Sequence, residues 1–277
     1  MSILHFPHEV VLILGATSGI GLALTEKLIS NGSHVIAVGR RQENLSQLQE
    51  NLSQLQEKHG KEKVSTYVFD VTALKRIPGF VDEIITSHPT LSSILLNSGI
   101  QRRLDFTSPS SIDLASVSLE LMTNYLSPIH FITFFLPHLQ SLSSRTEKET
   151  SLIFTTSGLA LVPIVRCPGY CASKAAMHHL ILCLREQLSN TDGYVKVIEI
   201  LPPAVQTELH DTKHQPDLED GRNFGMPLDE FTEEAWRGLC AGETDVAVGM
   251  ARISYEGWES QRQREFRGMV EKSAGAL

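Results

Sequence analysis

Short apolar runs alternate with helix-patterned stretches along almost the whole of this chain. Continuous apolar runs rich in β-branched residues suit strands buried on both faces, as the strands of a parallel sheet are. Seven such runs occupy residues 10–14, 34–38, 64–69, 93–96, 152–156, 195–200 and 246–248. Helical patterns lie between them at residues 20–30, 43–59, 80–86, 112–139, 172–188 and 230–239. The alternation predicts an α/β fold, a doubly wound parallel sheet of about seven strands in a single domain, with any ligand at the carboxyl ends of the strands.

The charge and the cysteine content exclude several classes of protein. The 277 residues include 24 Lys and Arg against 32 Asp and Glu, a formal net charge of −8. Nucleic acid or an anionic membrane would need a basic face, so neither is expected as a main partner. The four cysteines are too few for a disulfide framework in a chain of this length. Because no signal peptide or membrane span is recognisable, we expect a soluble, cytoplasmic protein.

Two pairs of residues with i, i+4 spacing have types that bind metals elsewhere. Cys167 and Cys171 form one pair, but no further Cys or His pair completes a zinc set. His210 and His214 form the other, which we expect to lie exposed on a loop beside prolines. The sequence therefore predicts no metal site.

Three segments stand apart from the strand–helix alternation. Residues 202–228 are rich in Pro and Gly and follow a predicted strand, so they are expected to form a lid over a site. Residues 43–56 repeat the heptad ENLSQLQ, which predicts a helix lengthened by about two turns and without a catalytic role. Residues 251–277 are expected to form a helical tail that packs on the 1–250 domain or on a partner, through Trp258, Phe266, Met269 and Val270.

A glycine-rich turn joins the first predicted strand to the first predicted helix. Residues 15–21 have the spacing GxxxGxG, with glycines at Gly15, Gly19 and Gly21. Glycines let the backbone turn tightly and approach a pyrophosphate, and the helix N-terminus adds free N–H groups and a positive dipole end. A turn without a ligand is the alternative, but the strand–turn–helix context favours nucleotide binding.

The second predicted strand is followed by two basic residues, Arg40 and Arg41. An acidic residue at this place would accept hydrogen bonds from an adenosine ribose and repel a 2′-phosphate. Arginines instead suit a phosphate through bidentate, charge-assisted hydrogen bonds. The pair predicts NADP(H) rather than NAD(H).

Tyr170 and Lys174 lie one turn apart at the start of a predicted helix, on the same face. A free tyrosine has a pKa of about 10, and a nearby cation stabilises the phenolate. We therefore expect Lys174 to lower the pKa of Tyr170 and make it an acid or base near neutral pH.

Together these motifs resemble the short-chain dehydrogenase/reductase family, whose motifs recur here in order along nearly the whole chain. The resemblance implies a Rossmann-type fold. It also implies that the 15–21 turn is a cofactor loop, to which Gly15, Thr17, Ser18, Gly19, Ile20 and Gly21 contribute. The double proline Pro202-Pro203 is similar to that of a subgroup often labelled DltE-like.

The resemblance assigns further cofactor contacts along the chain. Asp70 and Val71 resemble the family's Asp-Val pair, whose Asp contacts the adenine amino group. Asn97 and Gly99 resemble positions of its Asn-Asn-Ala-Gly motif, in which Leu96 replaces the first asparagine and Ser98 the alanine. The segment with Val205 and Thr207 resembles the one that fixes the nicotinamide carboxamide, with Pro203 in place of a glycine.

The same resemblance implies a catalytic set of Asn124, Ser157, Tyr170 and Lys174. In this set Tyr170 donates a proton to a carbonyl oxygen that receives hydride at its carbon. Ser157 donates a hydrogen bond to that oxygen, and Lys174 holds the nicotinamide ribose. Asn124 holds a water in the proton relay.

The expected activity is NADPH-dependent reduction of a ketone or aldehyde, or the reverse oxidation of an alcohol, by a homodimer or homotetramer. A medium-sized apolar substrate is expected from the residues that flank the predicted pocket, Leu159, Leu161, Val162, Ile164, Leu209, Phe224 and Met226. Two alternatives remain open. One is a non-catalytic NADP(H)-binding sensor, and the other is an epimerase or dehydratase on the same scaffold.

Overall fold

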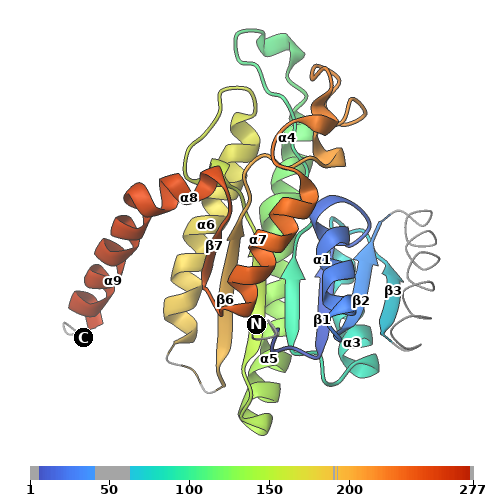
Figure 1. The fold of residues 1–277 in the computed structure, drawn as a ribbon, viewed down its shortest axis with the longest axis vertical. Helices are drawn as coiled ribbons and strands as arrows, with labels where there is room; N and C mark the ends of the chain where they lie inside the picture. The colour runs from blue at the N-terminus through green and yellow to red at the C-terminus, as the bar shows by residue number, and fades with distance from the viewer. Residues whose placement is uncertain (1–5, 41–62, 190, 192, 275–277) are drawn as a thin grey trace.

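The computed structural model describes residues 6–40, 63–189, 191 and 193–274 of the chain. Figure 1 shows one sheet with helices packed on both sides. The repeated heptads at 43–56, the predicted helix 43–59 and Arg41 lie outside the described residues, so the predictions for them stay predictions.

Seven strands form a single sheet in the order β3-β2-β1-β4-β5-β6-β7, and every neighbouring pair is parallel. This confirms the predicted doubly wound sheet. The chain reverses its direction of winding between β1 and β4, and ligands bind at the carboxyl ends of strands beside such a reversal. The strands are β1 (Val10–Leu14), β2 (His34–Gly39), β3 (Val64–Val68), β4 (Ser93–Leu96), β5 (Thr150–Thr155), β6 (Val195–Leu201) and β7 (Asp245–Ala247).

Helices cover both faces of the sheet because nearly every strand is apolar on both sides (Figure 1). On one face, α1 (Gly19–Ser30) and α7 (Leu228–Cys240) bury Leu24, Leu28, Phe231 and Trp236 against the strands. On the other face lie α3 (Ile77–Ser87), α5 (Ser127–Thr146) and α6 (Pro168–Leu188). Their core contacts include Phe80, Phe131, Phe135 and Ile181. Burial of these large side chains is the main favourable contribution to folding.

The single helix predicted over residues 112–139 is wrong in detail. The chain instead forms α4 (Leu114–Leu121), a π-helical turn (Met122–Leu126) and α5, which continues to Thr146. The Asp113 side chain accepts a hydrogen bond from the N–H of Ala115 at 3.0 Å, so the helix begins at residue 114. The π turn adds one residue to the helical repeat, a deviation that periodicity alone does not reveal.

The tail forms α8 (Met250–Ser254), a π-helical turn (Tyr255–Glu259) and α9 (Ser260–Ala274). In Figure 1 α9 extends from the β7 edge of the sheet and away from the body. The side chains of Trp258 and Met269 are exposed, so they do not pack on the domain, and their packing on a partner stays a prediction. The tail instead buries the polar side chains of Glu259 and Gln263, which contact His178 and Asp245 on the body.

Within the described residues, no helix is long and apolar enough to cross a bilayer. The predicted homodimer or homotetramer stays a prediction. Several large apolar side chains on α4, the π turn after it and α5 are exposed, among them Leu114, Leu119, Leu121, Leu126 and Phe134.

Candidate active site

The turn between β1 and α1 has the backbone geometry that its glycines permit. Gly15 and Gly19 have φ values of +82° and +52°, in the left-handed region that residues with a Cβ rarely adopt. The N–H groups of Gly15 and Ala16 both donate to the Val38 carbonyl, at 2.9 and 3.0 Å, so the turn is fixed to the end of β2. The first turn of α1 contains no acidic residue, so the positive end of its dipole is not neutralised locally. An anion can therefore bind there.

Close packing explains the third glycine. A Cβ on Gly21 would lie 2.0 Å from the Gly15 carbonyl oxygen and 2.6 Å from Asn97 Nδ2. Asn97 in turn donates from Nδ2 to the Gly15 carbonyl at 3.2 Å, which joins the end of β4 to the turn. Thr207 also reaches the turn, because a Cβ on Gly19 would lie 3.1 Å from its Cβ. Segments predicted separately from the sequence therefore meet here.

Arg40 and Asp70 lie at the ends of β2 and β3, beside the glycine turn. Arg40 Nη1 is 4.0 Å from Asp70 Oδ2, and the Arg40 side chain is 65% exposed. Asp70 Oδ1 accepts hydrogen bonds from the N–H and hydroxyl of Thr72, at 3.0 and 2.8 Å. Asp70 is thus fixed by its own turn, whereas the Arg40 guanidinium keeps donors available for another group.

Ser157, Tyr170 and Lys174 converge from two elements. Ser157 follows β5, and the other two residues lie one turn apart on α6. All three are buried. Lys174 Nζ donates to the Thr155 carbonyl at 2.8 Å and lies 5.6 Å from the centre of the Tyr170 ring. The Ser157 hydroxyl lies close enough to the Tyr170 phenol to affect its pKa, so hydroxyl, phenol and ammonium lie together at this place.

The expectation that Tyr170 has a lowered pKa is wrong. Burial raises the pKa of this phenol above its ordinary value, and the Ser157 hydroxyl offsets only part of that effect. Burial also lowers the pKa of Lys174 to about 8, although the charges of Glu199 and Glu120 raise it in opposition. Tyr170 therefore keeps its proton at neutral pH and is suited to donate it.

Asn124 lies in the π turn, behind this group. Its Nδ2 donates to the Ile100 carbonyl at 2.8 Å and to Ser173 Oγ at 3.1 Å, and its Oδ1 accepts from the Ile100 N–H at 2.9 Å. A Cβ on Gly99 would lie 3.5 Å from both Asn124 Oδ1 and Lys174 Nζ. Asn124 thus clamps the loop after β4 to α6 and brings Gly99 next to the lysine.

A cavity of about 570 Å³ joins the glycine turn to the Ser157–Tyr170–Lys174 group. The predicted residues that line it are Gly15, Thr17, Ser18, Gly19, Ile20, Arg40, Asp70, Val71, Asn97, Gly99, Ser157, Tyr170, Lys174, Val205 and Thr207. Gly21 and Asn124 support the walls from behind. The cavity is large enough for a cofactor and a small substrate.

Only some of the residues that were expected to flank the substrate pocket line the cavity. Leu159, Ile164, Leu209 and Phe224 line it. Leu161 instead packs against Leu201, Ala247 and Ala251, and Val162 is exposed. Met226 is held on the opposite side by a β-bridge to Val205 and packs into the core beside α7. These three residues therefore do not support an apolar substrate pocket.

Polar contacts join the segment 202–228 to Arg166, before α6, and to Gln101, after β4. Arg166, just before α6, donates to Asp217 at 3.0 and 2.6 Å and also contacts Gln215. Gln215 Nε2 donates to Gln101 Oε1 at 2.6 Å. The expectation that His210 is exposed is wrong, because it is buried under the lid, where burial lowers its pKa. Among the described residues, no group of three or more His, Cys, Asp or Glu side chains is arranged to hold a metal ion.

Glu120 is a site residue that the sequence reasoning missed. It lies one helical turn before Asn124 and is buried, with Oε2 accepting from the Arg102 N–H at 2.7 Å. A Cβ on Gly169, next to Tyr170, would lie 2.7 Å from Glu120 Oε1. Burial raises the pKa of Glu120 to about 7. The i, i+4 spacing to Asn124 was the available signal.

The Glu120→Gln variant is expected to be more stable than the parent protein at alkaline pH. The carboxyl keeps its proton in the folded state between its ordinary pKa of 4.5 and about 7, whereas the unfolded chain has lost it. Stability from this group is therefore lost as the pH rises through that window, and Gln removes the loss. We expect a gain of about 2 kcal/mol at pH values above about 8, and none below about 4.

Urea unfolding of both proteins across this pH range measures the difference. Glu271→Gln, on an exposed position of α9, controls for the loss of one negative charge. A gain that does not change with pH would contradict the assignment.

Comparisons with known proteins agree with this geometry. A family model described as short chain dehydrogenase matches residues 9–217. The uncharacterized oxidoreductase DltE of Bacillus subtilis is 30% identical over 240 residues, which cover 86% of this chain and 87% of that protein. Benzil reductase ((S)-benzoin forming) of Saccharomyces cerevisiae is 27% identical over 205 residues, 73% of each chain.

Solved structures share the fold. A short chain dehydrogenase from Burkholderia cenocepacia in complex with NADP has a TM-score of 0.71 and is 22% identical, covering 96% of this chain and 99% of its own. A short chain dehydrogenase/reductase from Burkholderia phymatum in complex with NAD has a TM-score of 0.76 at 16% identity, covering 94% and 97%.

Proposed function

Because this chain belongs to the short-chain dehydrogenase family of oxidoreductases, we propose that it transfers hydride between NADP(H) and a ketone or aldehyde, or the corresponding alcohol. The observation that carries the proposal is the convergence of Ser157, Tyr170 and Lys174 on the cavity that the glycine turn also lines. The benzil reductase of yeast, a relative of this chain, is named for the reduction of a carbonyl compound.

The residues present fit a nicotinamide dinucleotide. Close packing at Gly21 fixes the glycine turn, and Gly15, Gly19 and Ile20 line the cavity at the start of α1. Gly15 and Gly19 would hold the pyrophosphate side, Asp70 the adenine, and Val205 and Thr207 the nicotinamide amide. When bound, NADPH supplies the hydride; the protein supplies orientation and proton transfer.

The chain's own residues would handle the proton and the developing charge. Tyr170, which keeps its proton at neutral pH, donates it to the carbonyl oxygen. Ser157 donates a hydrogen bond to the same oxygen and stabilises the charge that forms there. The Lys174 ammonium binds the ribose and favours the tyrosinate that remains. Asn124 keeps Ile100 and Ser173 in place around this group.

We propose a medium-sized apolar carbonyl compound as the substrate. Leu159, Ile164, Leu209 and Phe224 line the cavity that Tyr170 and Ser157 also line, and Leu159 packs against Tyr170. NADPH consumption with a panel of apolar ketones and aldehydes, benzil among them, tests the activity. Tight NADPH binding without turnover of any compound would favour a cofactor-binding sensor, and conversion without net NADPH consumption would favour an epimerase or dehydratase.

Arg40 supports the proposed preference for NADPH, and Arg40→Ala tests it. The guanidinium at the end of β2 is exposed beside the cavity, where a 2′-phosphate could accept charge-assisted hydrogen bonds. The variant is expected to bind NADPH about tenfold more weakly, while its affinity for NADH stays unchanged. Fluorescence titration with both cofactors measures this.

Arg237→Ala, on the exposed face of α7, controls for the loss of a surface arginine. An equal loss of affinity for both cofactors would contradict the assignment of Arg40 to the 2′-phosphate.

A further inference from the structure

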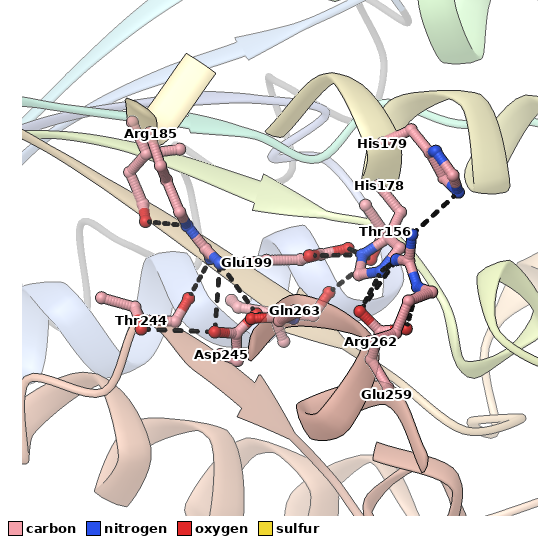
Figure 2. A network of polar contacts seen from close by, with 12 residues as sticks. Thr156, His178, His179, Arg185, Glu199, Thr244, Asp245, Glu259, Arg262 and Gln263 are labelled. Carbon is pink, nitrogen blue, oxygen red and sulfur yellow. Dashed lines mark hydrogen bonds and ion pairs between the residues drawn. The ribbon is translucent and has the colours of Figure 1, made fainter. Parts of the chain in front are cut away.

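A buried polar network connects the C-terminal tail to the sheet behind the candidate active site (Figure 2). Glu199 comes from β6, His178 from α6, and Glu259 and Arg262 from the tail. The side chains of Glu199 and Glu259 are 0% exposed and that of His178 is 1% exposed. Two carboxylates and an imidazole this deeply buried must be compensated by one another.

The network is continuous from the tail to β6. His178 Nδ1 lies 2.9 and 2.8 Å from the two carboxylate oxygens of Glu199, and its Nε2 lies 2.9 Å from Glu259 Oε1. Arg262 donates to both oxygens of Glu259, at 2.7 and 2.8 Å. Figure 2 shows the histidine between the two glutamates, with Arg262 beside both Glu259 and His178, and Arg262 Nη2 lies 2.8 Å from His178 Nε2. Each carboxylate therefore has a cationic partner when His178 is protonated.

The other end of the network reaches the strand end that holds the catalytic residues. Thr156 donates from Oγ1 to Glu199 Oε1 at 2.5 Å. Its neighbours on either side are Thr155, whose carbonyl accepts from Lys174, and Ser157, which affects the pKa of Tyr170. Lys174 also lies one helical turn before His178 on α6. Glu199 thus contacts the segment that positions the catalytic lysine and serine.

The charges of the network also connect Glu199 to Lys174. Glu199 and, after it, Glu120 are the charges that raise the pKa of Lys174 against its desolvation. Burial lowers the pKa of His178, but hydrogen bonds and charge from the two glutamates outweigh it and raise the pKa to about 9, so it is an imidazolium at neutral pH. The groups around Lys174 are therefore Glu199 on β6, Glu120 on α4, Tyr170 and His178 on α6, and, through His178, the tail pair Glu259–Arg262.

Tail anchoring alone does not explain this arrangement. Buried ion pairs lose much of their Coulomb energy to desolvation, and apolar residues of similar volume often replace them at no cost in stability. Apolar side chains are present on the tail, at Met250, Ile253 and Trp258, yet they are exposed while the charged ones are buried. The buried charges face the catalytic helix.

We propose that Glu199 is a positioning residue that keeps the Lys174 ammonium charged and fixes Thr156, and that the tail acts on the reaction through Glu259, His178 and Glu199. The proposal rests on the proposed function in giving Lys174 a part in the reaction. It makes the C-terminal helix a component of the active site, although none of the tail residues that the structure describes lines the cavity.

The Glu199→Gln variant tests the first part of the proposal. Gln has the same size and can still accept from Thr156, but it carries no charge. The pKa of Lys174 is expected to fall from about 8 by about one unit, because a buried ammonium has lost its largest counter-charge. NMR titration of the Lys174 Nζ in the full-length protein without cofactor measures this pKa, with Lys174→Arg to assign the signal.

The pH profile of kcat provides a second readout. The fall of kcat at alkaline pH is expected to move to lower pH by the same amount in Glu199→Gln. Thermal unfolding checks that each variant is folded. If the parent protein reduces no carbonyl compound, the proposed function fails, while the NMR titration still decides the role of Glu199.

Glu259→Gln tests the connection to the tail. Glu259→Gln removes one negative charge and leaves Arg262 without its carboxylate partner, so the surroundings of His178 and Glu199 become more positive. The shift in the Lys174 pKa is expected in the same direction and smaller. The double variant should shift no further than Glu199→Gln alone, because the tail acts through that residue.

Asp245→Asn is the matched control. Asp245 on β7 pairs with Arg185 of α6 at 3.0 Å and also contacts Gln263 of the tail, but it does not contact His178 or Glu199 through any side-chain hydrogen bond that the described residues show. It should lower stability without moving the Lys174 pKa. A Lys174 pKa that is the same in Glu199→Gln, Glu259→Gln and the parent protein would overturn the proposal and leave the network as an anchor only. If Glu199→Gln does not fold, Glu259→Gln decides by the same measure.

Discussion

Replacing Tyr170 by phenylalanine is expected to lower kcat about a thousandfold while the protein stays folded and still binds NADPH. The Tyr170 phenol is buried, and its raised pKa means that it carries a proton to donate at neutral pH. Phenylalanine fills the same space but leaves the carbonyl oxygen without a proton. Steady-state kinetics with the best ketone of the panel, together with NADPH titration, measures both effects.

A second tyrosine serves as the control for this variant. Tyr67 on β3 has a hydroxyl 3.1 Å from His88 Nε2 and does not line the cavity. Tyr67→Phe removes a phenolic hydrogen bond without touching the reaction and should keep normal turnover. Near-normal turnover in Tyr170→Phe would refute its role as the proton donor.

Gly21→Ala is expected to weaken NADPH binding by about a hundredfold or more. The added methyl group would lie 2.0 Å from the Gly15 carbonyl oxygen, and this nearest atom is backbone, which cannot move aside as a flexible side chain can. The turn must therefore shift, and its N–H groups lose the arrangement that receives the pyrophosphate. NADPH titration measures the loss, and circular dichroism shows whether the sheet is intact.

The chain offers a matched control in Gly79, on α3. A Cβ there would meet no atom within 4 Å, so Gly79→Ala has room for its methyl group. Alanine in a helix is favoured over glycine by about 1 kcal/mol, so this variant should be slightly more stable and bind NADPH normally. Normal binding by Gly21→Ala would show that the turn does not hold the cofactor.

Local signals in the sequence predicted the sheet and the glycine turn correctly, because both depend on contiguous residues. Val10, Leu12 and their neighbours are apolar on both faces, and a parallel sheet is the structure that buries both faces. Tyr170 and Lys174 were paired by helical spacing alone, and the structure places both at the cavity. Their roles in the reaction stay predictions.

Contacts between distant residues could not be predicted in the same way. Glu199 and His178 lie within largely apolar segments, where nothing in the sequence pairs them. Glu259 is 81 positions from His178 in the sequence, and only the fold brings the two together. The pKa of Tyr170 was misjudged for a related reason, because helical spacing reveals the nearby cation but not the degree of burial. The burial of Glu259 and Gln263 in the tail could not be predicted either, because their partners lie on distant elements.

The π-helical turn at residues 122–126 has a consequence for how this protein can diverge. An ordinary helix turns once in about 3.6 residues, so the five-residue turn offsets the angular phase of α5 from that of α4. α4 presents Glu120 to the loop of Arg102, while α5 presents Phe131 and Phe135 to the sheet. The orientation of α4 is therefore not tied to that of α5. In evolution α4, near the cavity, can be remodelled without rotating α5, which supports the hydrophobic core.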